Sequence, residues 1–373
     1  MYFIISLVRC NLMSPYMTTF LITFIVSTIS VPFVIKFARN IGAVDIPDNR
    51  KVHKKAVPRI GGISIYIAFL TGFIYISTLI DLNISIIVAA TIIMITGFID
   101  DKLQIKPWQK LVGQTLAAVI VLADGLSIKY LTVPFLDESI PVNIWVALIV
   151  SFIWIIGVTN AVNLIDGLDG LASGVSIIAA SAIFVMALIM NEINVAFLSI
   201  ALIGSTLGFL IFNFHPAKIF MGDTGSLLLG FLLSVLSIIG FKQVTFITFI
   251  IPMVILAVPL TDTTIAIIRR KLQNKKIMDA DKNHLHHRLL DAGFTHRKAV
   301  LFIYFISLFF GVSAILLYKA NLFASIIIFI LILLIIELLI EGFELISKNY
   351  KPLLSLYKKL NSKKIGIEND KNA

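Results

Sequence analysis

The sequence has few of the residues that cross-link small domains or carry charge. Cys10 is the only cysteine in 373 residues, so the chain cannot form an intramolecular disulfide or a cysteine-rich zinc site. Charged residues make up only 14% of the chain, and six residues are histidine. A soluble chain of this length would predict two or three domains, but so low a charge content excludes an ordinary soluble protein.

Apolar residues dominate the composition instead. Hydrophobic residues make up 58% of the sequence and the mean hydropathy is +0.99. Runs of about 20 apolar residues can cross a bilayer as helices. The sequence therefore predicts an all-α, polytopic integral membrane bundle of about eleven transmembrane helices. The expected spans are 17–35, 60–80, 84–99, 111–128, 143–161, 170–190, 194–213, 225–241, 244–268, 299–318 and 321–341. Pro252 and Pro259 predict that the ninth span is kinked or broken.

The net charge of +10 is explained by topology. Of the 31 lysines and arginines, 27 fall in stretches on one side of the predicted membrane, namely 36–59, 100–110, 162–169, 214–224, 269–298 and 342–373. Basic residues gather on the cytoplasmic side, so we expect an outside N-terminus and a cytoplasmic C-terminus. The basic face suits anionic membrane lipids. Without a basic domain or a stacking motif, nucleic-acid binding is not expected. Residues 1–341 then form a single membrane domain and 342–373 a basic cytoplasmic tail.

The loops on the predicted cytoplasmic side contain the acidic and histidine motifs. Asp100 and Asp101 end the third span, where the helix dipole disfavours anions. A solvated helix end is one interpretation and a functional acid pair is the other. Because all the motifs share one side, we expect their side chains to converge on one face.

The segment 160–171 has the densest polar pattern. Asn160, Asn163, Asp166 and Asp169 recur every three residues, which on a helical turn places them roughly on one face. Such groups are costly beside a membrane and therefore indicate function. Amides can bind a base or sugar, and carboxylates can bind Mg²⁺ or a lysine. A purely structural polar face remains an alternative.

A further acid, Asp223, opens the eighth span after Phe220 and just before Gly225. A carboxylate at a helix entry can bind a metal ion, and it can also act as an N-cap. Phe220 can face lipid or stack on a base.

The histidines His284, His286 and His287 form the last motif, next to Arg288. Zinc binding, phosphate binding and a solvated loop all remain open for them, although no His-Glu-x-x-His or cysteine partner is present. Asp262, beside Pro259, is a further candidate site residue. His53, His215 and His296 are isolated in the sequence, and a solvated or structural role is favoured for His296.

Taken together, these motifs resemble the polyprenyl-phosphate N-acetylhexosamine-1-phosphate transferases. The matching pieces, in the expected order, are His53 with 58–62, 97–101, 160–171, 220–226 and 284–287. One branch of that family makes the first lipid-linked peptidoglycan precursor and usually has three consecutive histidines and several lysines after the Asp pair. Here Leu285 interrupts the histidines and the lysines are sparse. The chain is therefore more similar to the branch that transfers GlcNAc-1-phosphate from UDP-GlcNAc to undecaprenyl phosphate.

The resemblance implies a Mg²⁺-dependent enzyme of a bacterial cytoplasmic membrane, with its active site on the cytoplasmic face. That branch starts O-antigen, enterobacterial common antigen and wall teichoic acid. The implied metal ligands are Asp223 and Asp166, with Mn²⁺ as an alternative ion. The implied catalytic residues are Asp100, Asp101, Asp166, Asp169, His284, His286 and His287. The implied substrate-binding residues are His53, Arg59, Lys110, Asn160, Asn163, Phe220 and Arg288. The partners are a UDP-N-acetylhexosamine, undecaprenyl phosphate and membrane lipids, and a homodimer is left open.

Two other functions remain as alternatives. The peptidoglycan-precursor transferase differs only in branch. A transporter of an anionic lipid or solute differs in class, and it would place ionisable groups near the membrane midplane in discontinuous helices. Because the acids of this chain gather at helix ends, interfacial chemistry is the favoured function.

Overall fold

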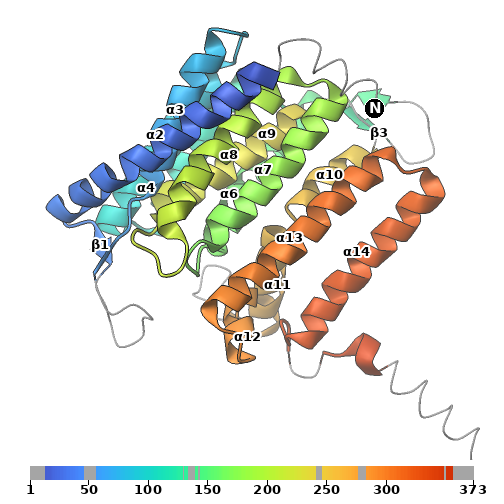
Figure 1. Ribbon diagram of the computed structural model, residues 1–373. Helices are drawn as coiled ribbons and strands as arrows, with labels where there is room; N and C mark the ends of the chain where they lie inside the picture. The colour runs from blue at the N-terminus through green and yellow to red at the C-terminus, as the bar shows by residue number, and fades with distance from the viewer. Residues whose placement is uncertain are drawn as a thin grey trace, which may run out of the picture.

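A computed structural model describes residues 13–45, 56–128, 130–132, 139–141, 143–240, 246–275, 283–347 and 350–355 (Figure 1). Each of the eleven apolar segments predicted from the sequence is helical. The helices are α2 (Met13–Asn40), α3 (Gly62–Ser77), α4 (Ile84–Leu103), α5 (Pro107–Ala123), α6 (Ile144–Leu164), α7 (Leu171–Met190), α8 (Ile193–Asn213), α9 (Gly222–Gly240), α10 (Phe246–Ile255), α11 (Ala257–Leu272), α12 (Leu285–Asp291), α13 (His296–Lys319) and α14 (Leu322–Gly342).

Eight of the helices in the described part of the chain are long and apolar enough to cross a membrane, namely α2, α4, α6, α7, α8, α9, α13 and α14. Helix α3 is apolar but has only 16 residues. The all-α, polytopic membrane architecture is therefore confirmed. The number of eleven crossings and their orientation stay predictions.

Helix α9 is the centre of the bundle. In its most apolar window 89% of the residues are buried, compared with 17% for α14 at the edge of the molecule (Figure 1). It packs against α3, α4, α6 and α7. Its interior position is marked by small and hydroxyl side chains; for example, Ser237 accepts a hydrogen bond from the Trp154 indole at 2.9 Å. The first turn of α9 is therefore within reach of several other helix ends.

The predicted break in the ninth span is confirmed at Leu256, between α10 and α11. Pro259 has no N–H to donate to the carbonyl four residues earlier, and its ring crowds that carbonyl. The residue four positions before Pro259 is Ile255, which is the last residue of α10. The first turn of α11 thus accommodates Pro259, but a continuous helix through α10 and α11 would not.

Two short antiparallel hairpins lie at opposite ends of the bundle (Figure 1). Strand β1 (Val44–Asp45) pairs with β2 (Val57–Pro58), with Val44 opposite Pro58. Strand β3 (Tyr130–Thr132) pairs with β4 (Ser139–Pro141). Beyond β2 the chain runs along the entry to α9, because the N–H of Gly61 donates to the carbonyl of Phe220 at 3.0 Å.

Helix α5 begins at a fixed point that determines where Lys110 lies. Pro107 occupies the first helical position, and the Gln109 side chain accepts a hydrogen bond from the backbone N–H of Lys106 at 2.8 Å. Proline at this position loses no helical hydrogen bond. Lys110 therefore lies one turn into α5, close to where α4 ends.

Candidate active site

Asp101 joins the end of α4 to the start of α9. Its carboxylate accepts hydrogen bonds from the backbone N–H groups of Asp223 and Thr224, each at 2.9 Å, and from the Thr224 hydroxyl at 2.5 Å. The Arg59 guanidinium lies 3.2 Å from the same carboxylate. The first N–H groups of a helix lack helical partners, and the positive end of its dipole favours an anion. Asp101 is therefore a buried cap for another helix and also pairs with Arg59.

The backbone at Gly222 makes this close junction possible. Gly222 has φ +68°, and a Cβ there would lie 1.9 Å from the Arg59 carbonyl and 2.4 Å from Asp101 Oδ2. Any other residue would collide with both and would be strained in the left-handed region. The glycine thus allows the segment 59–62 and the end of α4 to meet the start of α9.

Lys110 binds two carboxylates at once. Its ammonium lies 2.6 Å from Asp100 and 2.5 Å from Asp223, and the three side chains are 25%, 8% and 18% exposed. Asp223 is in the first turn of α9 and directs its carboxylate to Lys110, while Asp101 caps the helix. The interpretation of Asp223 as a mere N-cap is therefore wrong. The sequence alone does not identify Asp101 as the cap, because α4 and α9 are far apart in the chain.

The end of α6 forms another wall of this cluster. The Asn163 amide donates to Ser226 on α9 at 2.8 Å and also hydrogen-bonds the Asp223 side chain. Burial, together with the charges of Asp223, Asp101 and Asp169, raises the pKa of Asp166 to about 8. Its carboxylate is therefore buried and has other carboxylates as neighbours.

This cluster of carboxylates is where a hard cation would fit. Four carboxylates, of Asp100, Asp101, Asp166 and Asp223, lie around two basic side chains, Lys110 and Arg59. Mg²⁺ prefers carboxylate oxygens. A divalent ion beside Asp166 and Asp223 would offset both the burial of the Asp166 carboxylate and its repulsion by Asp223, so the residues present fit the metal that the resemblance implies.

Asn160 has a different environment from Asn163. Its amide donates to Gln114 at 2.7 Å and to the Ile156 carbonyl at 2.8 Å, and it accepts a bond from Gln114 at 3.3 Å. These contacts brace α5 against α6. A substrate contact of Asn160 stays a prediction, and the structure shows a bracing role for its amide.

Helix α12 brings the histidine motif to the same end of the bundle. Asp262 accepts from the backbone N–H of Leu285 at 2.9 Å and pairs with His284 Nδ1 at 2.8 Å, so it holds the start of α12. His286 packs against Gly167, where an added Cβ would lie 2.2 Å from Nε2. The glycine thus leaves room for the histidine beside Asp166.

The buried His286 is neutral at ordinary pH. Burial, followed by the neighbouring charge of His287, lowers its pKa to about 3. A neutral imidazole can donate one hydrogen bond and accept another, but it cannot neutralise phosphate. His287 tilts against His286 with ring centroids 4.2 Å apart. Arg288 donates to the Glu344 carbonyl at 3.1 Å, which directs at least part of its guanidinium toward the C-terminal segment.

All the predicted substrate contacts stay predictions, and His53 and Phe220 complete the set. His53 lies outside the described residues. Phe220 is half-buried and its backbone is fixed by the segment after β2, because its N–H donates to the Pro58 carbonyl at 2.7 Å. Stacking of Phe220 on a base stays a prediction.

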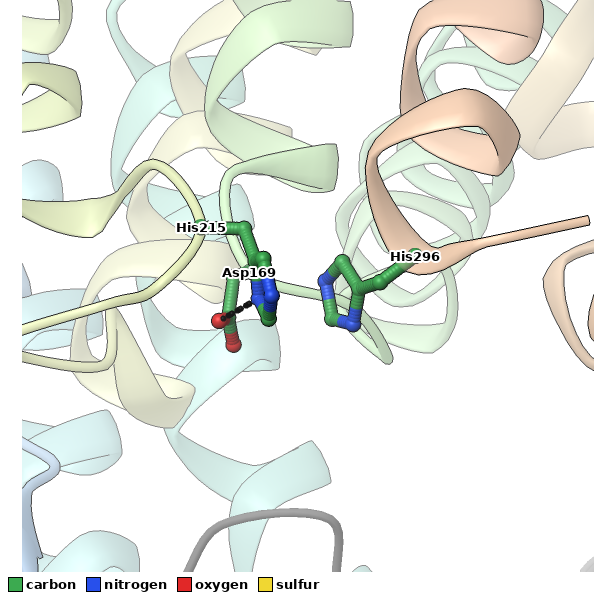
Figure 2. Close-up of side chains that lie close together, drawn as sticks. All are labelled: Asp169, His215 and His296. Carbon is green, nitrogen blue, oxygen red and sulfur yellow. Dashed lines mark hydrogen bonds and ion pairs between the residues drawn. The ribbon is translucent and has the colours of Figure 1, made fainter.

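The sequence analysis missed one constellation completely. Asp169, His215 and His296 come from three separate segments, and each offers a ligand atom within 4.8 Å of the others (Figure 2). His215 Nδ1 lies 2.7 Å from Asp169 Oδ2. No local pattern links these residues, because 46 positions separate Asp169 from His215. Only the fold brings them together.

Comparison with known proteins places the chain among membrane phosphotransferases. Residues 83–241 match the family model described as glycosyl transferase family 4. A protein of Bacillus subtilis described as a probable undecaprenyl-phosphate N-acetylglucosaminyl 1-phosphate transferase is 44% identical over 350 residues, covering 92% of this chain and 98% of the relative. A decaprenyl-phosphate N-acetylglucosaminephosphotransferase of Mycolicibacterium smegmatis is 35% identical, covering 75% and 76%.

The peptidoglycan branch is also related, at lower identity. A phospho-N-acetylmuramoyl-pentapeptide-transferase of Halalkalibacterium halodurans is 33% identical over 315 residues, covering 80% of this chain and 94% of the relative. The greater identity and coverage of the Bacillus relative agree with the branch that the interrupted histidines predict. The chain belongs to glycosyl transferase family 4, in the branch of the polyprenyl-phosphate N-acetylglucosamine phosphotransferases.

Proposed function

We propose that this protein transfers GlcNAc-1-phosphate from UDP-GlcNAc to undecaprenyl phosphate, giving undecaprenyl-diphosphate-GlcNAc and UMP. The observation that carries the proposal is the Asp100–Lys110–Asp223 bridge at the entry to α9, next to Asp166. Two anionic substrates need fixed charge of both signs where they meet. The names of the polyprenyl-phosphate relatives support the same acceptor and sugar phosphate.

The reaction joins two phosphates. An oxygen of the lipid phosphate forms a bond to the β-phosphorus of UDP-GlcNAc. The bond from that phosphorus to the bridging oxygen breaks, and its electron pair leaves with UMP. In phosphoryl transfer the protein contributes mainly position and charge.

We propose that Asp223 and Asp166 hold Mg²⁺, with Mn²⁺ as a substitute. When bound, the ion supplies positive charge that offsets the negative charge of the phosphates. Asp100 orients the lipid phosphate as a base or hydrogen-bond partner. Lys110 offsets the repulsion between Asp100 and Asp223 and fixes their positions, because its ammonium lies within 2.6 Å of both carboxylates.

Residues around this cluster bind the nucleotide and sugar. Asn163 and Phe220 face the donor's uridine, and the neutral imidazole of His286 contributes a hydrogen bond next to Gly167. Asp101 supports the site by capping α9, and Asp169 supports it by binding the backbone of Ala217 in the loop between α8 and α9. A transporter would need no such bridge of basic and acidic groups at one helix end.

The topology that goes with this function has eleven crossings, an outside N-terminus and a cytoplasmic active site in a bacterial cytoplasmic membrane. It rests on the 27 basic residues on one side. A reporter fused after Lys351 is expected to read cytoplasmic, and one fused after Leu82 is expected to read external. The opposite result at either position would contradict the eleven-span arrangement. This enzyme would act at the first membrane step of an envelope polysaccharide, within the single domain 1–341.

The donor is tested by competition in one assay. Purified protein, undecaprenyl phosphate and Mg²⁺ are supplied with UDP-GlcNAc and UDP-MurNAc-pentapeptide, and each lipid product is measured. We expect UDP-GlcNAc to have the larger kcat/KM by at least about 100-fold, because groups built to hydrogen-bond one donor reject another strongly.

The same assay also tests the branch assignment and the need for the lipid acceptor. A larger kcat/KM for the pentapeptide donor would move the chain to the peptidoglycan branch and leave the family unchanged. Omission of undecaprenyl phosphate is the control, since UMP release without the acceptor would be hydrolysis.

A further inference from the structure

Asp169, His215 and His296 bring three different segments to one point (Figure 2). Asp169 lies between α6 and α7, His215 lies between α8 and α9, and His296 is the first residue of α13. Their ligand atoms all lie within 4.8 Å of one another. Thr295 caps α13 with a hydrogen bond from the N–H of Lys298 at 3.4 Å, which fixes where His296 emerges.

The protein contacts of the three side chains leave ligand capacity open. Asp169 Oδ2 accepts from the backbone of Ala217 at 3.1 Å and pairs with His215 Nδ1 at 2.7 Å. The two imidazoles stack with centroids 4.1 Å apart and an interplanar angle of 20°. His296 Nε2 is buried and makes no hydrogen bond of normal geometry among the described residues, although the Asp169 backbone lies close enough to act on its ring. Figure 2 shows one ring nitrogen of His296 directed toward the Asp169–His215 pair.

A buried, unbonded nitrogen is costly unless something binds it. A metal ion would satisfy the lone pair and the carboxylate together, since Zn–N and Zn–O bonds are about 2.0–2.2 Å long. To surround such an ion, the ligand atoms, which lie within 4.8 Å of one another, would draw together, and the stacked rings would turn so that their lone pairs meet at the ion.

We propose that Asp169, His215 and His296 form a second metal site, which binds a zinc-class divalent ion. Two imidazoles and one carboxylate favour Zn²⁺ or Co²⁺ over Mg²⁺, which prefers oxygen ligands alone. The site is chemically distinct from the carboxylate cluster at Asp223. The His215 side chain is 31% exposed and that of Asp169 is 16% exposed, so an ion can enter from solvent.

The ion would act as a clip between segments. It would tie the start of α13, and with it α12, to the loop that carries Asp166 and to the loop that leads into α9 and Asp223. His286 of α12 packs on Gly167 in one of these loops. The Arg297 guanidinium binds the carbonyl of His215 at 3.1 Å, so it adds positive charge near the site without offering a ligand. The clip does not depend on which sugar is transferred.

The test measures metal binding by the full chain, purified in detergent with a tag that contains no histidine and stripped with a chelator. We expect one Co²⁺ per chain with the visible spectrum of a low-coordinate site, displaced by Zn²⁺ and not by Mg²⁺. Zn²⁺ is also expected to raise the melting temperature. His215→Gln and His296→Gln should each weaken Co²⁺ binding at least about 10-fold, because each loses a ligand.

The controls separate this site from other histidines. Arg297→Gln should bind Co²⁺ at least as well as the wild type. His286→Gln should keep the cobalt spectrum, and its loss in that variant would assign the ion to residues 284–287 and overturn the proposal. His296→Cys gives a positive signal, because a thiolate ligand adds a sulfur-to-cobalt charge-transfer band. Absence of that band in a folded protein, or of any Co²⁺ binding by the wild type, would also overturn the proposal.

Discussion

Asp223→Asn is expected to lower transferase turnover at least about 100-fold at saturating Mg²⁺, as expected for removal of a fixed electrostatic contact in a catalytic site. Asparagine keeps the shape of the side chain and still bonds to Asn163 or Lys110, but it loses the charge that Mg²⁺ needs. The measurement is the rate of UMP release by purified variant and wild type over a range of Mg²⁺ concentrations.

The fold should survive this change. Asp101 makes its hydrogen bonds to the backbone N–H groups of Asp223 and Thr224, so the start of α9 keeps its cap. We therefore expect a melting temperature close to that of the wild type. Asp124→Asn is the matched control, because Asp124 bonds Asn83 and Ser85 at a site away from the acidic cluster. Near-normal turnover of Asp223→Asn would place the metal site elsewhere.

The sequence predicts the helices well because membrane spans are local. A run of about 20 apolar residues needs no information from the rest of the chain. All eleven apolar segments are helical in the structure, and α10 ends four residues before Pro259 because proline acts on its own helix.

The roles of individual acids are less local. Asp101 follows Asp100 directly in the chain, yet Asp101 caps α9 while Asp100 binds Lys110. The helix dipole at the end of α4 does disfavour an anion. The dipole at the start of α9, which begins more than 100 residues later, favours one, and the local sequence does not reveal that neighbour. A pair of adjacent carboxylates in the sequence therefore indicates a site, but it does not tell which carboxylate caps a helix and which binds the lysine.

The histidines also show that the sequence reveals local motifs but not contacts between distant segments. The run at 284–287 is visible in the sequence, whereas His215 and His296 are isolated there. Their rings stack in the structure because the segment before α9 meets the start of α13. Helix packing alone creates that neighbourhood, so neither residue type nor spacing could have predicted it.

Lys110→Met is expected to reduce turnover at least about 100-fold, by a route different from that of Asp223→Asn. Methionine keeps much of the apolar stem but removes the ammonium that lies between Asp100 and Asp223. Two neighbouring carboxylates without a shared cation repel each other, and one of them then takes up a proton or moves away. Both consequences remove the arrangement that two anionic substrates need. The measurement is kcat and KM for both substrates at several Mg²⁺ concentrations.

A matched change on the same helix distinguishes this role from general loss of positive charge. Lys106 is exposed at the start of α5, so Lys106→Met should keep near-normal turnover. Added Asp100→Asn in the Lys110→Met background should restore part of the melting temperature, because it removes one of the two repelling charges, but it should not restore turnover. Unchanged turnover in Lys110→Met would mean that Lys110 only balances charge in the resting protein and that bound substrates or Mg²⁺ displace it. Full recovery of turnover in the double variant would mean that repulsion alone, and not the ammonium, limits the reaction.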